Sequence, residues 1–279
     1  MSAVDFIPED FATNGVAVFP NAVDADGLAE LRSIIDELVD GFDPAGVKTV
    51  FSTDDQSHAR SDYFLTSGDK TRYFLEDGAL DANGDLVGDK RRALNKVGHA
   101  MHDLDPAMSN FCRSGAFAHA ASAVGMTAPR LLQSMVMFKN PEVGGEVSIH
   151  TDHTFLWTEP QSVIGFWLAI DGATEENGCL WALPGGHTIP VKSRFVRNAE
   201  NTATEMEVFD DSPYPDDGWV PLEAEPGTLI ALHGSLPHRS APNLSHKPRL
   251  AFTLHCIEAD ADYPASNWLQ RPDMPLTGF

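Results

Sequence analysis

Cysteine is scarce in this sequence, which has three in a chain of 279 residues: Cys112, Cys179 and Cys256. They lie far apart, and no two of them form a C-x-x-C pair. The pattern therefore excludes a disulfide framework and a zinc site built from thiolates. We interpret the three side chains as small buried hydrophobes.

Positive charge is also in short supply. The chain has 19 Lys and Arg residues against 41 Asp and Glu residues, which gives a formal net charge of −22 at pH 7. A surface this acidic repels DNA, RNA and anionic lipid. We therefore predict that the chain has neither a nucleic-acid partner nor a membrane partner.

Long hydrophobic runs are absent. No apolar stretch reaches the roughly 18 residues needed to cross a bilayer. The opening segment "MSAVDFIPEDF" lacks the basic flank and apolar centre of a secretory signal. These absences predict a cytoplasmic protein, and the sequence carries no signal for its oligomeric state.

The first 129 residues are predicted to be mainly helical. Residues 24–42 place leucine and isoleucine at helical spacing, with Asp24 or Asp26 as the N-cap and Gly41 at the end. Two further predicted helices complete this part of the chain: 91–104 and 106–125.

From residue 130 the pattern becomes typical of β-structure. Short segments rich in β-branched and aromatic residues alternate with Gly, Pro and Asn clusters, which indicates a sandwich or barrel. The predicted strands lie within these ranges: 130–140, 145–155, 162–171, 178–188, 227–234 and 249–259. We predict a mainly β fold with flanking helices, in a single domain of residues 1–279. Its helical part is mainly 1–129 and its β-core mainly 130–260.

The segment "EVSIHTDHTF", residues 146–155, suggests metal chemistry. In a strand, residues i and i+2 point to the same face. His150 and Asp152 would then converge, while Thr151 and His153 would face the other way. One imidazole and one carboxylate on a single face supply two ligands of the 2-His-1-carboxylate triad found in non-haem Fe(II) oxygenases.

The third ligand has to come from a distant strand, and His238 is the favoured candidate. It lies in a polar, proline-flanked stretch, and Arg249 follows eleven residues later at the start of a predicted strand. An arginine there could bind the distal carboxylate of a diacid co-substrate in a bidentate pair. His233 is the alternative ligand, although it leaves the arginine without an obvious role.

An H-x-D triplet alone is weak evidence for a metal. Other histidines and tryptophans are interpreted more simply. His153 is a supporting or surface group, His187 a turn residue and Trp181 a core aromatic. The remaining histidines at helical positions are interpreted as solvated or packed: His99, His102 and His119.

Several motifs in the same order make a more specific signal. The H-x-D at 150–152, "ENGCLWALPGGHT" and the spacing of His238 and Arg249 resemble the phytanoyl-CoA dioxygenase family of Fe(II)/2-oxoglutarate oxygenases. The similarity is greatest to its branch of phytanoyl-CoA dioxygenase domain-containing protein 1. Features of that branch recur as "SDYFLTSGDKTRYFLEDG", "QSMVMFK" and "GGEVSIHTDHTFLWTEP", and the resemblance runs from about Phe11 to "NWLQ".

This resemblance implies a fold and a set of roles. The fold would be a double-stranded β-helix, a cupin-like jelly roll, and the cofactors Fe(II), 2-oxoglutarate and O2. His150, Asp152 and His238 match the iron ligands, and Arg249 matches the arginine that binds the distal carboxylate of 2-oxoglutarate. The other positions matched to the co-substrate pocket are Lys96, Met135, Thr151, Trp167 and Ser240.

The expected reaction is hydroxylation of a C–H bond in a small molecule, with release of succinate and CO2. Related halogenases have a small residue in place of Asp152, so its presence favours hydroxylation. Two alternatives stay open: a non-catalytic jelly-roll protein that binds a metal or ligand, and an O2-independent cupin-like metalloenzyme using zinc or manganese.

The substrate is not determined by the sequence. The family name suggests acyl-CoA thioesters, but no basic cluster suits the CoA phosphates, and the net charge of −22 disfavours a polyanion. Residues 51–90 have a loop-like composition and an Asn83–Gly84 turn signal. We predict that this stretch contributes to a substrate lid.

Overall fold

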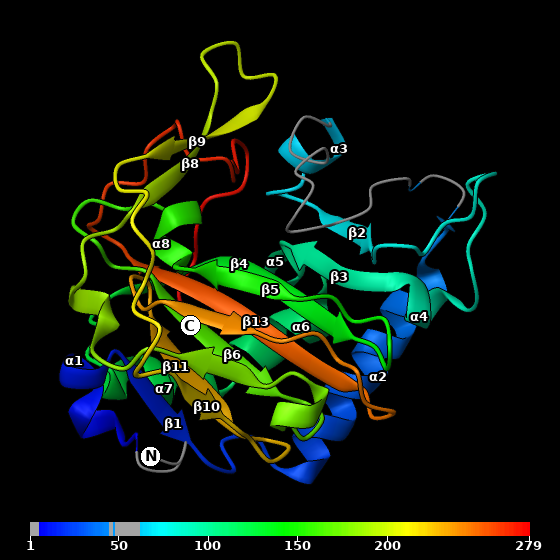
Figure 1. Ribbon diagram of the computed structural model, residues 1–279, viewed down its shortest axis with the longest axis horizontal. Helices are drawn as coiled ribbons and strands as arrows, with labels where there is room; N and C mark the ends of the chain where they lie inside the picture. The colour runs from blue at the N-terminus through cyan, green and yellow to red at the C-terminus, as the bar shows by residue number, and fades with distance from the viewer. Residues whose placement is uncertain (1–5, 45–46, 48–61) are drawn as a thin grey trace.

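The core of the computed structural model, which describes residues 6–44, 47 and 62–279, contains a seven-stranded sheet (Figure 1). Its strand order is β1-β11-β6-β13-β4-β3-β2, and neighbouring strands are antiparallel. The strands are β1 (Val16–Phe19), β2 (Thr71–Leu75), β3 (Leu94–His99), β4 (Pro129–Lys139), β6 (Ile164–Ala169), β11 (Leu229–His233) and β13 (Arg249–Glu258). Most of these strands are buried on both faces.

A smaller antiparallel sheet faces this one, with strand order β10-β7-β12-β5. Its strands are β5 (Val147–His150), β7 (Leu180–Ala182), β10 (Val220–Leu222) and β12 (His238–Ser240). Side chains of both sheets share one hydrophobic cluster, which includes Trp167, Ala251, Ala182 and Leu222. The two open sheets therefore form the jelly-roll core that the sequence predicted. A separate hairpin pairs β8 (Ser193–Arg197) with β9 (Thr204–Val208).

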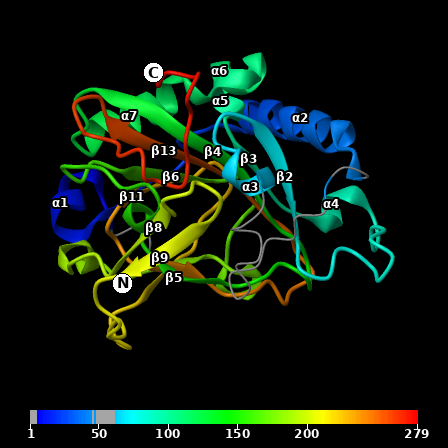
Figure 2. The same ribbon diagram turned by 90° about the horizontal axis from the view of Figure 1, so that it is seen from above.

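Helices cover the outer face of the large sheet. Figure 2 shows α2 (Ala25–Gly41), α6 (Pro106–Cys112) and α7 (Gly115–Ala123) on that side and β5 on the other. Alternate residues of β13, such as Phe252 and Leu254, join these helices in the largest hydrophobic cluster. The remaining short helices are α1 (Phe11–Asn14), α3 (Asp62–Leu65), α4 (Lys90–Ala93), α5 (Met101–Leu104), α8 (Asp152–Phe155), and the 3₁₀ turns η2 (Pro8–Asp10), η5 (Glu175–Asn177) and η6 (Gly186–Thr188).

The helix predicted at residues 24–42 is confirmed in its bounds and its cap. The Asp24 carboxylate accepts a hydrogen bond from the Gly27 backbone N–H at 2.9 Å, and α2 ends at Gly41. The predicted helix 106–125 is two helices, α6 and α7, which are separated at residues 113–114. The predicted turn at Asn83–Gly84 is present, with Gly84 at φ +84°.

The prediction of a helix over residues 91–104 is wrong for its central part. Residues 94–99 form β3, which pairs with β2 on one side and β4 on the other. Its residues are almost all buried, so the segment lacks the alternation that marks a half-exposed strand. Besides its helices, the first 129 residues also contribute β1, β2 and β3 to the large sheet. The strand prediction also missed β10, β12 and the β8–β9 hairpin.

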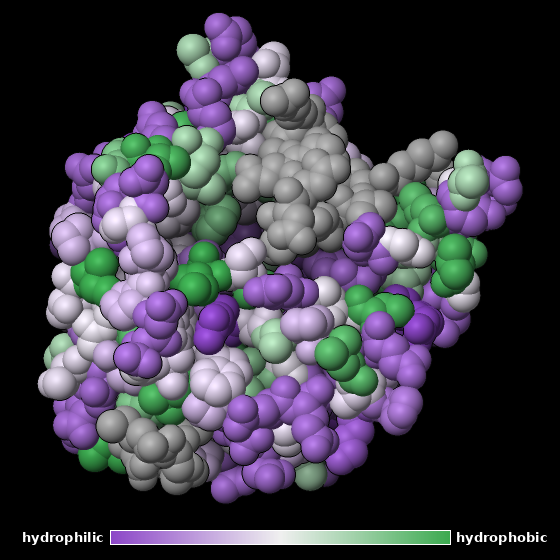
Figure 3. All heavy atoms as spheres, in the orientation of Figure 1, coloured by the Kyte–Doolittle hydropathy of each residue, from purple (hydrophilic) through white to green (hydrophobic). Residues whose placement is uncertain are grey.

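Hydrophilic residues cover most of the face drawn in Figure 3, and hydrophobic residues appear there as small separate patches. This agrees with the large excess of acidic residues in the composition. Among the described helices, none combines the length and the apolar composition that a membrane span requires.

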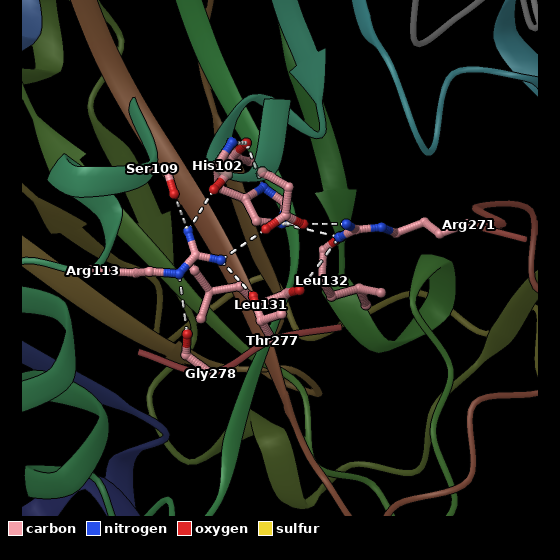
Figure 4. Close-up of polar contacts among 10 residues, drawn as sticks. His102, Ser109, Arg113, Leu131, Leu132, Arg271, Thr277 and Gly278 are labelled. Atoms are coloured by element: carbon pink, nitrogen blue, oxygen red, sulfur yellow. Dashed lines mark hydrogen bonds and ion pairs between the residues drawn. The ribbon is translucent and has the colours of Figure 1, made fainter. Parts of the chain in front are cut away.

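A partly buried ion-pair network fixes the C-terminal segment to α5 (Figure 4). Asp103 accepts hydrogen bonds from Arg113, at 2.8 Å, and from Arg271. Arg113 also donates to Thr277 and Gly278, and Arg271 donates to the backbone oxygen of Leu132 at 2.9 Å. Burial alone would raise the pKa of Asp103, but His102 and the two arginines outweigh it and hold the pKa well below its usual value.

We predict that Asp103→Asn lowers the free energy of unfolding at pH 7 by about 2 kcal/mol, because both arginines lose their partly buried counter-charge. A depressed folded-state pKa stabilises the fold above the unfolded value of about 4 and loses this effect as the pH falls. The difference between variant and wild type should therefore shrink below about pH 4. Urea titrations at several pH values test this. The control is Asp36→Asn, an exposed partner of Arg91, which should change stability by less than about 1 kcal/mol.

Candidate metal centre

Three side chains from three elements meet at one edge of the small sheet. His150 ends β5, Asp152 begins α8 and His238 begins β12. One nitrogen or oxygen atom from each lies within 4.8 Å of the others, a spacing that could hold a metal ion. The Asp152 Oδ1 atom is 4.0 Å from His150 Nε2 and 3.7 Å from His238 Nε2.

Sheet pairing and local backbone explain the convergence. His150 and His238 are direct cross-strand partners of β5 and β12, and their ring centroids are 4.2 Å apart. Strand β5 ends at His150, so Asp152 does not lie in a continuing strand. Thr151 nevertheless keeps an extended conformation, with φ −123° and ψ 143°. The side chains of His150 and Asp152 therefore still reach a common point, as the H-x-D spacing predicted.

Hydrogen bonds set the tautomers of both histidines. His150 Nδ1 lies 2.9 Å from the Ser148 carbonyl oxygen, and His238 Nδ1 lies 2.9 Å from the Leu236 carbonyl oxygen. A carbonyl can only accept, so each Nδ1 carries the hydrogen and each Nε2 presents a lone pair. Burial, with the neighbouring imidazole of His238, lowers the pKa of His150 to about 4, which keeps it neutral at pH 7.

Asp152 is oriented by a third histidine that the sequence analysis did not identify. His255 Nε2 lies 3.4 Å from Asp152 Oδ2, and both residues are buried. Burial alone would raise the pKa of Asp152, but the surrounding imidazoles outweigh it and hold that pKa below its usual value. A sequence signal existed: His255 is six residues after Arg249, hence on the same face of a continuous strand.

Gly165 provides the space for this carboxylate. It lies on β6 and pairs with His255 on β13. A Cβ atom at position 165 would lie 2.5 Å from Asp152 Oδ2 and 3.3 Å from the His255 ring. The close packing of Asp152 and His255 therefore requires glycine at this position.

The other histidines that the sequence singled out lie outside the three-residue cluster. His233, the alternative third ligand, packs against His187, with ring centroids 4.9 Å apart, and belongs to no metal-binding group among the described residues. His153 is buried, stacks on Trp157 and accepts a hydrogen bond from the Thr158 N–H. It is therefore not a surface group, and it lies outside the three-residue cluster.

A cavity of about 360 Å³ opens beside His150 and Asp152. Three of the residues matched to the co-substrate pocket line its wall: Lys96, Met135 and Thr151. Burial lowers the pKa of Lys96 to about 7. Its ammonium nitrogen lies 5.3 Å from the centre of the Phe74 ring. Of the predicted lid, residues 51–61 are outside the described part of the chain, while Phe64 lines the cavity.

The other matched residues are Trp167, Ser240 and Arg249, and all three are buried away from the lining of this cavity. Arg249 is 3% exposed, and its guanidinium lies 5.5 Å from the centre of the Trp167 ring. Its Nε and the Ser240 hydroxyl have no hydrogen-bond partner in the described structure. Burial lowers the pKa of Arg249 to about 10, so it remains cationic at pH 7.

These orphaned donors fit a carboxylate ligand. Buried polar groups in folded proteins nearly always have partners, and an unpaired buried cation is costly. A dicarboxylate at Arg249 and Ser240 would satisfy both groups. The imidazole and carboxylate donors of the three-residue cluster are those that iron(II) accepts in facial sites. The residues present therefore fit both an iron ion and a diacid co-substrate.

Lys139 links the loops around the site, a role that no sequence motif indicated. It is the cross-strand partner of Arg249, and its ammonium donates to the carbonyl oxygens of Gly145 and Ala241, at 2.7 Å each. A Cβ atom at Gly178 would lie 2.7 Å from its side chain. Gly145 precedes β5 and Ala241 follows β12, so one buried lysine anchors both ligand-bearing strands to β4.

Comparisons with known proteins agree with this geometry. A family model described as phytanoyl-CoA dioxygenase (PhyH) matches residues 11–251. A phytanoyl-CoA dioxygenase of Arabidopsis thaliana is 41% identical over 268 residues, covering 95% of this chain and 93% of the relative. Phytanoyl-CoA dioxygenase domain-containing protein 1 of Bos taurus is 38% identical over 277 residues, covering 96% and 95%.

Solved structures share the fold at low identity. The non-haem α-ketoglutarate-dependent epimerase SnoN from nogalamycin biosynthesis superposes with a TM-score of 0.66 at 16% identity, covering 99% of this chain and 96% of that one. EctD from S. alaskensis with 2-oxoglutarate and 5-hydroxyectoine superposes with a TM-score of 0.63 at 18% identity, covering 96% of this chain and 83% of that one.

Fold, donor set and sequence relatives together define the class of this chain: a non-haem iron and 2-oxoglutarate-dependent dioxygenase. Within that class it belongs to the phytanoyl-CoA dioxygenase family, as the motifs of the sequence predicted.

We predict that Gly165→Ala weakens metal binding by about 10- to 100-fold, because the added methyl displaces the Asp152 carboxylate from His255. Titration calorimetry with Co(II) measures the affinity, and thermal melting shows whether the variant is folded. Gly172→Ala is the matched control, since its Cβ atom would have no neighbour closer than 3.7 Å. Unchanged affinity in a folded Gly165→Ala variant would contradict the role given to this contact.

Proposed function

We propose that this chain hydroxylates a C–H bond of a small molecule, using iron(II) held by His150, Asp152 and His238. The observation that carries the proposal is the convergence of these three donors within 4.8 Å of one another. Facial sites of this composition leave coordination positions open for small molecules. Iron(II) and 2-oxoglutarate, when bound, supply the oxidising chemistry: O2 is consumed, 2-oxoglutarate gives succinate and CO2, and one oxygen atom enters the substrate.

The protein itself holds and orients the metal ligands. The carbonyls of Ser148 and Leu236 keep His150 and His238 in the tautomer that presents Nε2. His255 holds one oxygen of Asp152, which leaves the other, Oδ1, directed at the two imidazoles.

Arg249 is assigned to the distal carboxylate of 2-oxoglutarate. Its guanidinium is rigid, buried and packed over the Trp167 ring, so it is organised before the ligand arrives. Ser240 offers a second buried donor without a partner in the described residues. Lys96, Met135 and Thr151 line the cavity beside the metal ligands, and we assign them to the wall of the co-substrate pocket.

The type of reaction depends on the residues of the site. SnoN shares the fold and is described as an epimerase, so the fold does not fix the reaction. Asp152 supports hydroxylation, because the carboxylate occupies a position that a halide would need. The two alternatives, a non-catalytic binding protein and an O2-independent metalloenzyme, differ from this proposal in their need for O2 and 2-oxoglutarate.

We expect the protein with Fe(II), ascorbate and 2-oxoglutarate to form succinate in air, at a slow uncoupled rate without substrate, and none under nitrogen. Asp152→Ala should reduce this rate by at least about 100-fold, because a ligand and its charge are both removed. Succinate is measured by chromatography. Asp36→Ala, which removes an exposed carboxylate on α2 paired with Arg91, is the control. An active Asp152→Ala variant, or no succinate from the folded wild type, would refute the proposal.

Arg249→Ala should raise the KM for 2-oxoglutarate by about 100-fold while leaving metal affinity within about twofold, since a buried bidentate pair contributes on the order of 3 kcal/mol. The KM of Arg249→Lys should lie between those of wild type and Arg249→Ala, because lysine keeps the charge but not the paired donors. Arg239→Ala is the matched control: this arginine packs over Trp219, 4.7 Å from its ring centre. Equal KM values for wild type and Arg249→Ala would contradict the assignment of Arg249 to the distal carboxylate of 2-oxoglutarate.

A further inference from the structure

Two polar side chains form a pair on the cavity wall beside the metal ligands. Gln133 on β4 and His255 on β13 are direct cross-strand partners. Both line the cavity of about 360 Å³, and they are only 4% and 6% exposed. Neither was among the residues that the sequence assigned to iron or to 2-oxoglutarate.

Both side chains present hydrogen-bonding groups to the cavity. The Gln133 amide, which can donate two hydrogen bonds and accept two, lies on the cavity wall, where a ligand can reach it. His255 directs Nε2 to the Asp152 carboxylate, which accepts, so Nε2 carries the hydrogen. In the neutral imidazole this leaves Nδ1 as the acceptor, and Nδ1 is buried without a partner in the described structure. Native proteins rarely leave such groups unsatisfied unless a ligand or water uses them.

The position of the pair separates it from the co-substrate end of the same strand. Arg249 begins β13, and His255 lies six residues later, on the same face. At about 3.4 Å per residue, roughly 20 Å of strand separates them. A diacid bound at Arg249 therefore lies towards one end of β13, and the polar pair lies beside Asp152 towards the other.

Four aromatic side chains form a large part of the cavity wall near the metal ligands. Phe64 and Trp268 stack with ring centroids 4.5 Å apart, and Phe195 packs against both. Phe155 meets the His150 ring edge-on at 5.9 Å. All four line the cavity. A ligand that reaches the polar pair thus has its remaining surface against aromatic rings.

Charge complementarity argues against an anionic primary substrate beside the polar pair. The described part of the wall carries two lysines, and both are engaged within the protein. Lys192 pairs with Asp210 and Ser212, and Lys96 contacts the Phe74 ring. The net charge of −22 adds a repulsive field for any polyanion.

We propose that Gln133 and His255 form the polar subsite for the primary substrate, which is a small uncharged molecule carrying a carboxamide or hydroxyl group on an apolar, ring-sized body. The substrate's N–H or O–H donates to His255 Nδ1, and its oxygen accepts from the Gln133 amide. A thioester of CoA, with its phosphates, does not fit this chemistry. The inference rests on the proposed function, because it places the substrate beside the proposed iron ligands.

Two matched probes test the subsite: 3-phenylpropanamide and 3-phenylpropanoate, which differ only in a neutral or an anionic polar group. Binding is measured by ligand-observed NMR on the full chain loaded with Zn(II) and N-oxalylglycine, an inert analogue of 2-oxoglutarate. We expect the amide to bind at least tenfold more tightly than the carboxylate. Gln133→Leu should remove that preference while leaving Zn(II) affinity unchanged. Met137→Leu, on the same strand, should retain it.

The inference is overturned if the two probes bind equally, if neither binds, or if a folded Gln133→Leu variant keeps the preference. Thermal melting reports whether each variant is folded, and the comparison of probes on wild type stands without any variant. Uncoupled succinate formation is measured on the same wild-type preparation. Wild type that forms succinate but shows no preference for the amide refutes the subsite alone, whereas wild type that forms no succinate refutes the proposed function.

Discussion

The pairing of β5 with β12 is the interaction on which the site depends. It sets His150 opposite His238 although the two residues are 88 positions apart in the chain (238 − 150). Backbone hydrogen bonds orient both rings, so the two Nε2 atoms face Asp152 before any ligand arrives. Preorganisation of this kind requires that both strands keep their register. Lys139 helps to ensure it, because its ammonium binds a carbonyl beside each strand.

Strand β13 organises the rest of the chemistry through simple alternation. Its inward residues include Arg249 and His255, while outward residues such as Phe252 pack under the helices. One face of a single strand therefore contributes both the buried cation assigned to the co-substrate and the imidazole that orients the metal-binding carboxylate. The strand is buried almost throughout, so these side chains are held by packing on both of its faces.

The sequence predicted those parts of the site that depend on short-range spacing or on ordered motifs. H-x-D needs only one extended residue between its members, and Thr151 provides it even though the strand has ended. The contribution of Lys139 could not be predicted, because it arises from a cross-strand pair with Arg249 that no local pattern encodes. His255 shares a strand face with Arg249, but its contact with Asp152 depends on its cross-strand pairing with Gly165. For the fold, α2 was predictable from its cap and periodicity. β3 was not, because pairing on both edges outweighed a helix-like composition.

The Asp103 network has a consequence that reaches well beyond α5. Arg271, which it immobilises, lies three residues after Trp268, whose ring forms part of the aromatic wall beside the metal ligands. The segment after β13 therefore forms part of the wall of the cavity beside the metal ligands. Substitutions in this segment can change which substrates the cavity accepts without altering the metal ligands. Substrate selectivity can therefore evolve separately from metal binding.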